Sequence, residues 1–112
     1  MYAALFEMTS WMGTKQYIFT GNTASEMLSK FEDVQSLECL VRMGIREERS
    51  ASGKKAINDL EALLDKHYSG TLTNEDLLGL DIKISIGSIK CVVILEGDDA
   101  ADKLKAEYPK AK

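Results

Sequence analysis

The stretch Asp81–Leu95, DIKISIGSIKCVVIL, carries the strongest structural pattern in this chain of 112 residues. Apolar side chains occupy every second position on both sides of Gly87-Ser88, and a two-residue Gly-Ser turn suits a type II′ β-hairpin. The pattern therefore predicts a hairpin in which eight apolar side chains share one face. In that register Leu80 lies opposite Leu95, Ile82 opposite Val93, Ile84 opposite Cys91 and Ile86 opposite Ile89.

A second hairpin is predicted near the start of the chain, where two β-rich runs flank Gly13-Thr14. The apolar side chains of the first run share one parity, as expected for a strand with one buried face. A loop longer than two residues would shift the register of the pairing. With Gly13-Thr14 as the turn, Met8 pairs with Phe19 and Ser10 with Tyr17.

A helix and then a strand are predicted to follow the first hairpin. Thr23–Glu26 has the S/T-x-x-E form of a capping box, and apolar residues recur after it at helical spacing. The helix is therefore expected to run from about Ala24 to Val34. The next run, Leu37–Ile45, alternates apolar with largely charged side chains, which is typical of a strand with one buried face.

Three further helical segments are predicted around the Asp81–Leu95 hairpin. An amphipathic pattern over Ala56–Leu64 follows a loop and cap at Ser50–Gly53 and ends before Gly70, where a C-terminal glycine is expected. Thr73–Leu78 is predicted to add one helical turn capped by its threonine. The last helix is short, begins at Asp98 or Asp99 and stops at Pro109.

The predicted order of elements, β-β-α-β-α-β-β-α, indicates an α+β fold. A strand, helix and strand in succession favour a right-handed crossover, while the hairpins add antiparallel pairs. We therefore expect a single domain over residues 1–112, built as a two-layer α/β sandwich. Its mixed sheet would hold about five strands, with the helices packed on one apolar face.

Composition limits the class of protein. Apolar residues make up 45% and charged residues 29%, as in an ordinary globular protein, and a net charge of −4 argues against a surface built for nucleic-acid phosphates. The segment Met1–Trp11 lacks the basic start of a secretory signal, and no apolar run approaches membrane-spanning length. We therefore expect a cytoplasmic location, with Cys39 and Cys91 as reduced, buried hydrophobes.

Residues that support catalysis or metal binding are sparse. His67 is the one histidine and is predicted to be a polar residue at a helix end; the cysteines form no C-x-x-C pair. Acidic residues at 96–102 are predicted to favour a helix start, and Ser52–Lys55 is predicted to be a solvated cap rather than a phosphate site. We therefore predict a protein that is not an enzyme, with no catalytic residues, no metal ligands and no cofactor.

The charge distribution is more informative than these isolated residues. The window Arg42–Lys55 holds five bases and two acids, a net charge of +3, which leaves −7 for the rest of the chain. Within the predicted strands, Arg42, Arg46, Lys83 and Lys90 lie opposite the apolar parity. A sheet with helices on one face only would present these cations together on its open face.

That open face is the predicted binding surface for a partner. Tryptophan and arginine beside exposed apolar area are enriched where proteins bind one another. Two alternatives compete with this hypothesis: the sheet is covered on both faces, or the charges are ordinary solvated strand residues. The predicted partner-binding residues are Trp11, Arg42, Arg46, Lys83, Lys90 and Val92.

The sequence therefore favours a small protein-binding module that acts by occluding a partner protein, as an inhibitor, an immunity protein or a phage antagonist does. The first alternative is a nucleic-acid accessory protein that uses the Arg42–Lys55 stretch. Its weakness is a shortage of aromatic residues for base stacking. The second alternative is a subunit of a homo-oligomer, joined by a free sheet edge or by apolar spots on the open face. No membrane partner is expected.

Overall fold

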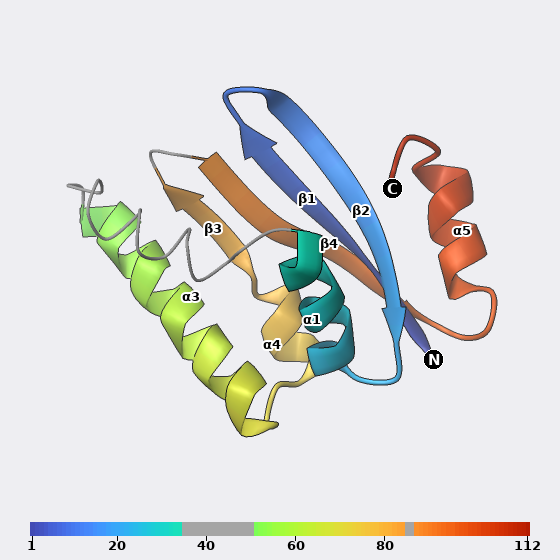
Figure 1. Cartoon of the computed structure of the whole chain (residues 1–112), viewed down its shortest axis with the longest axis horizontal. Helices are drawn as coiled ribbons and strands as arrows, with labels where there is room; N and C mark the ends of the chain where they lie inside the picture. The colour runs from blue at the N-terminus through green and yellow to red at the C-terminus, as the bar shows by residue number, and fades with distance from the viewer. Residues whose placement is uncertain (35–50, 85–86) are drawn as a thin grey trace.

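The computed structural model describes residues 1–34, 51–84 and 87–112, which form an α+β fold around one sheet (Figure 1). The four strands of this sheet are antiparallel, in the order β2-β1-β4-β3. The strands are β1 (Tyr2–Ser10), β2 (Gly13–Gly21), β3 (Asp81–Ile84) and β4 (Gly87–Glu96). The helices are α1 (Ala24–Val34), α3 (Ala51–Ser69), α4 (Asn74–Leu78) and α5 (Ala100–Glu107).

The α+β class is confirmed, but the predicted mixed sheet of five strands is not what the described strands form. Every described pair is antiparallel. β1 runs opposite to β2 on one side and to β4 on the other, and β3 runs opposite to β4. The predicted strand Leu37–Ile45 lies outside the described residues, so the crossover that motivated a mixed sheet is not tested.

Helices lie on both faces of the sheet, so the predicted two-layer arrangement is wrong at one end. Figure 1 shows α1, α3 and α4 on one side of the strands and α5 on the other. The second face carries an apolar core of its own beneath α5, which is why a helix covers it. That core contains Ala3, Leu5, Ala100, Leu104 and Ala111, with Ile18, Val93, Leu95, Ala101 and Tyr108 packed against it.

Both hairpin turns fall two residues earlier than predicted. Ser10 pairs with Gly13 across the first turn, and Ile84 pairs with Gly87 across the second, so each glycine follows its turn. Both glycines have positive φ, +112° at Gly13 and +155° at Gly87, a region that favours glycine. Because each turn is displaced by an even number of residues, alternate side chains still face the predicted sides of the sheet, but each residue has a different partner across the strands.

The new registers give different cross-strand neighbours on the first face. Phe6 pairs with Tyr17, and Ile82 pairs with Ile89 rather than with Val93. Phe6 also stacks on Phe31 of α1, with ring centroids 4.7 Å apart. The first core, between the sheet and α1, α3 and α4, is built around these side chains and others: Ala4, Met27, Leu28, Ile57, Leu60, Leu64, Leu77, Leu80 and Cys91.

A β-bulge interrupts the pairing of β1 with β4 and changes which side chains face each core. Leu5 pairs with Val93 but Phe6 pairs with Cys91, so Val92 is an extra residue in β4. After the bulge the alternation is reversed. The prediction of eight apolar side chains on one face is therefore wrong: Val93 and Leu95 pack in the second core and Ile94 packs against the first.

Local capping signals position the helices largely as predicted. α1 has the predicted bounds, with the Thr23 hydroxyl accepting from Glu26 N–H at 3.1 Å and the Glu26 carboxylate accepting from Asn22 N–H at 2.7 Å. α3 begins earlier than predicted, because the Ser50–Gly53 stretch that was expected to form a loop belongs to the helix from Ala51 onward.

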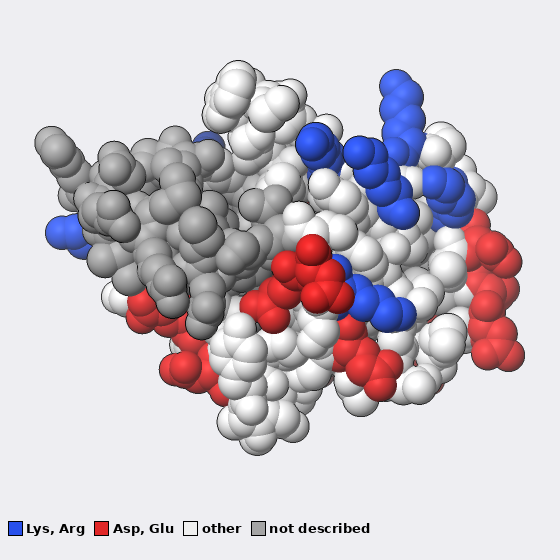
Figure 2. All heavy atoms as spheres, viewed as in Figure 1, with Lys and Arg blue, Asp and Glu red and all other residues white. Residues whose placement is uncertain are grey.

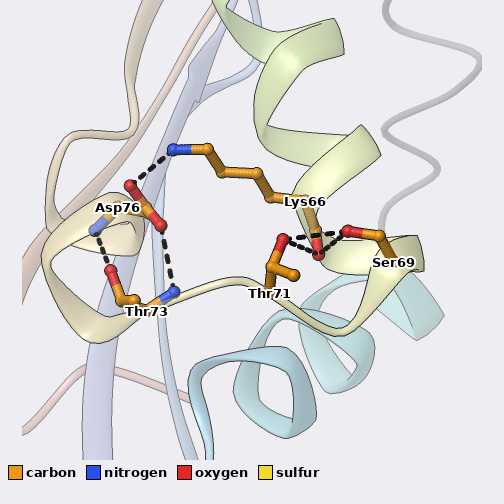
Figure 3. Close-up of polar contacts among 5 residues, drawn as sticks. All are labelled: Lys66, Ser69, Thr71, Thr73 and Asp76. Atoms are coloured by element: carbon orange, nitrogen blue, oxygen red, sulfur yellow. Dashed lines mark hydrogen bonds and ion pairs between the residues drawn. The ribbon is translucent and has the colours of Figure 1, made fainter.

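The corner between α3 and α4 is fixed by Lys66 through both its backbone and its side chain (Figure 3). Its carbonyl accepts from Thr71 N–H at 3.0 Å and its ammonium donates to Asp76 Oδ1 at 3.0 Å. Asp76 and the N-cap Thr73 form the predicted cap as a full capping box. Gly70, with φ +77°, ends α3 as predicted.

Replacing Gly87 by alanine is expected to cost more stability than replacing Gly13. A Cβ at Gly87 would lie 2.5 Å from the carbonyl oxygen of Thr9, whereas a Cβ at Gly13 would meet nothing within 4 Å. Positive φ alone costs about 1 kcal/mol at Gly13, and the added clash raises the cost at Gly87 to about 2–4 kcal/mol. Urea unfolding of the two variants measures the difference, and equal losses would contradict the clash.

The Asp76 carboxyl is expected to titrate below its ordinary range. The hydrogen bond from Lys66 lowers its pKa most, and the bonds from Thr73 lower it further. Its contribution to stability is therefore present above the pKa of an unfolded aspartate and is lost as pH falls through the lowered folded value. NMR titration should show the pKa of Asp76 rising in Lys66→Met but not in the control Lys55→Met, whose ammonium contacts Asp59 instead.

Candidate functional site

The predicted binding residues are divided between the sheet and a turn. Lys83 of β3 and Lys90 of β4 lie on the second face, because their neighbours Ile82 and Ile89 are buried in the first core. Val92 is the bulged residue and its exposed fraction is 37%. Trp11 lies in the β1–β2 turn rather than on the sheet. Arg42 and Arg46 lie outside the described residues.

The second face is divided into an apolar part beneath α5 and a polar part at the other end. Glu7 is central to the polar part: it accepts a hydrogen bond from Gln16 Nε2 at 3.0 Å and lies 3.6 Å from Lys90 Nζ. Lys90 is therefore a paired charge and not a free cation. The sequence pattern also places Ile18 and Ile94 on the open face, and this is wrong, since Ile18 packs against the core beneath α5 and Ile94 packs against the first core.

The β1–β2 turn is the most conspicuous apolar feature of the described surface. Trp11 is 91% exposed and Met12 is 70% exposed, and the two residues are consecutive. Figure 1 shows this turn projecting at the top of the view, beyond the helices, and Figure 2 shows uncharged atoms projecting there. Met12 N–H donates to the Ser10 hydroxyl at 3.2 Å, and Thr9 bonds Thr14 across the strands at 3.0 Å.

Lysines gather at a second place that the sequence did not single out. Figure 2 shows blue side chains at the upper right, over the C-terminal end of α5 and the start of β2. The residues after α5 return to β2, where Lys112 N–H donates to the Gln16 carbonyl at 2.9 Å. The predicted basic window is described only in α3, where Lys55 pairs with Asp59 at 3.0 Å.

His67 is buried between α1 and α3, although the sequence indicated only a polar residue at a helix end. Its side chain is 7% exposed, with Nε2 lying 3.3 Å from Glu32 Oε2 and 3.4 Å from Ser29 Oγ. Its Nδ1 is buried and has no hydrogen-bond partner among the described residues. A Ser-His-acid triad uses both ring nitrogens, one for each partner. Here one nitrogen contacts both partners, so the arrangement differs from that of a triad, and the cluster links α1 to α3.

Cys91 is a buried thiol of the first core, as predicted for a small hydrophobe. Burial raises its pKa to about 12, well above the ordinary value of 9.0. A thiol that remains protonated at neutral pH is neither a good nucleophile nor a good metal ligand. Cys39 lies outside the described residues.

Other chemistry is sparse in the described ranges. Among these residues, no three His, Cys, Asp or Glu side chains are grouped so that they could hold a metal ion. No described helix is long and apolar enough to cross a membrane. Asp99, which was predicted to cap the last helix, makes no side-chain cap and instead pairs with Lys103 at 3.3 Å.

Comparisons of the chain with protein-family models, with curated proteins and with solved structures found no significant match in any of the three.

Cys91 is expected to resist alkylation while the protein is folded. At pH 8 its thiolate fraction is lowered on the order of a thousandfold by the raised pKa, and burial blocks access as well. Iodoacetamide labelling followed by peptide mass spectrometry distinguishes Cys91 from Cys39. The control is the same protein in guanidinium chloride, where labelling should be fast; a folded rate near the denatured rate would contradict the buried site.

Proposed function

We propose that this protein is a protein-binding module whose contact site is centred on the β1–β2 turn. The observation that carries the proposal is the exposed pair Trp11 and Met12 at the tip of a hairpin. Tryptophan is among the residues that contribute most binding energy at protein interfaces, and methionine is enriched there. An exposed aromatic anchor on a projecting turn suits insertion into a pocket of a partner protein.

The hairpin holds these side chains on a rigid base. β1 and β2 pair without interruption from Tyr2–Gly21 to Ser10–Gly13, and β1 is paired with β4 along its other side. A turn held in this way loses little further conformational freedom on binding, which lowers the entropic cost of association.

Polar residues next to the turn would form the rim of the interface. Thr9 and Thr14 flank the turn, and the polar part of the second face continues from them through Gln16, Glu7 and Lys90. Rims of protein interfaces are polar and remain partly hydrated. Of the residues predicted from sequence, Lys83, Lys90 and Val92 would lie in this rim. Arg42 and Arg46 are assigned to the rim from the sequence pattern alone.

The proposed mode of action is occlusion, in which the bound module blocks a surface of its partner, as an inhibitor, an immunity protein or a phage antagonist does. Binding of this kind needs surface complementarity and no reacting group in the module. The turn itself, where the aromatic anchor is flanked by the neutral residues Thr9 and Thr14, supports a protein partner over a nucleic acid, since the polyanionic backbone favours cations at the contact.

Affinity capture with matched variants tests the proposal. The tagged protein is used to capture partners from lysate of its source cell, with and without nuclease, and the captured protein is then titrated. Trp11→Ala should weaken binding at least about tenfold, the loss typical of an interface hot spot. The control Leu78→Ala removes an exposed apolar side chain of α4 and should leave the affinity unchanged.

Two outcomes would overturn the proposal. One is a partner whose affinity is the same for Trp11→Ala and for wild type. The other is recovery of nucleic acid alone, with binding that weakens steeply as salt rises, which would move the function to the Arg42–Lys55 stretch.

A further inference from the structure

β2 forms one edge of the sheet, and its backbone groups alternate between β1 and the outside. The two-residue turn makes Ser10 and Gly13 a hydrogen-bonded pair, so every second residue of β2 from Gly13 onward bonds to β1. The residues between them direct their N–H and C=O groups away from the sheet. These outward residues are Thr14, Gln16, Ile18 and Thr20.

Two hydrogen bonds agree with this alternation, because each reaches an outward carbonyl. Lys112 N–H donates to the carbonyl of Gln16 at 2.9 Å, and Lys30 Nζ donates to the carbonyl of Thr20 at 2.6 Å. Within the described part of the chain, the outward backbone groups of Ile18 between them have no partner. An edge with unpaired groups is a template for another strand.

β2 lacks the usual features that keep an edge strand from pairing. It contains no proline, its nine pairs with β1 include no bulge, and Lys15 is its single charged residue. The edge is closed instead by segment 109–112. Ala111 is 1% exposed in the core beneath α5, and its carbonyl accepts from Lys105 Nζ.

A second copy of β2 would fit this edge in antiparallel orientation. With Tyr17 at the two-fold axis, each outward residue of one strand meets an outward residue of the other: Gln16 meets Ile18, and Thr14 meets Thr20. Lys15 meets Phe19, so no like charges lie opposite one another. The pairing satisfies outward groups on both strands and gives a continuous sheet across the dimer.

We propose that the outer edge of β2 is a strand-addition site for a second copy of this chain, held closed in the monomer by segment 109–112. Release of Ala111 from its core frees the Gln16 carbonyl and uncovers the edge. Lys30, which has a flexible side chain, then leaves Thr20 as the incoming strand supplies a backbone N–H in its place.

Ala111→Arg in the full-length chain tests the proposal. A guanidinium cannot remain in this apolar site without partners, so the variant should expel the segment. Sedimentation velocity over a range of concentrations should show a dimer with a dissociation constant at least about tenfold below that of wild type. The control Ala106→Arg makes the same substitution at an exposed position of α5 and should behave as wild type.

A second substitution tests whether the dimer interface is the outer edge of β2. Gln16→Pro removes an outward N–H and the side-chain bond to Glu7, but it removes no backbone hydrogen bond to β1, so Ala111→Arg combined with Gln16→Pro should return to the monomer. An Ala111→Arg protein that stays monomeric with a native circular dichroism spectrum overturns the proposal. A dimer that survives Gln16→Pro overturns it as well.

Lys105→Met settles the question if Ala111→Arg does not fold. This variant removes only the ammonium that holds the Ala111 carbonyl and keeps an apolar stem. It should shift the equilibrium toward the dimer, and a protein that remains as monomeric as wild type overturns the proposal. Trp11→Ala leaves β2 intact and should not alter dimerisation, so failure of the proposed partner site and failure of the edge site give different results.

Discussion

The structure depends on the first half of β1 being enclosed along both edges and both faces. It pairs with β2 along one edge and with β4 along the other, and both of its faces are covered in its first half. Ala4 and Phe6 point into the core beneath α1, α3 and α4, while Ala3 and Leu5 point into the core beneath α5. A strand covered in this way must be apolar at consecutive positions, which explains the run Ala3–Phe6.

β4 also contributes apolar side chains to both cores, and the bulge at Val92 changes which core its alternate residues face. Before the bulge, Ile89 and Cys91 fill the first core; after it, Val93 and Leu95 fill the second. The bulge marks where the second face changes from a polar surface to an apolar site for α5. The bulge therefore lies at the boundary between the polar part of the second face and the part that α5 covers.

Local signals in the sequence were sufficient for the helices and insufficient for the registers. The caps at Thr23 and Thr73 act within four residues, so the sequence could locate α1 and α4. A glycine with positive φ fits both inside a turn and directly after it. The prediction placed Gly13 and Gly87 inside their turns, whereas each follows its turn, so both turns were predicted two residues too late. The bulge was missed because the run Cys91–Leu95 is continuously apolar and permits either parity.

The candidate site was predicted only in part, because a local sequence pattern shows the type of a residue but not its exposure or its distant partners. Trp11 was identified by its residue type, and its high exposure in the turn is a property that residue type alone does not give. The pairing of Lys90 with Glu7 joins positions far apart in the sequence and depends on the register of β1 with β4. A local pattern could not show that this cation is neutralised. Arg42 and Arg46 stay predictions.

The position of β1 also has a consequence for how the chain folds. Its pairing with β4 brings Tyr2 next to Glu96, so β2 follows β1 directly in the chain, whereas β4 follows only after α1, α3 and α4. Contacts of such long sequence separation slow folding, because a large loop must close before they form. Until then the nascent hairpin presents Phe6 and an unpaired strand edge to solvent, the kind of surface on which chaperones act.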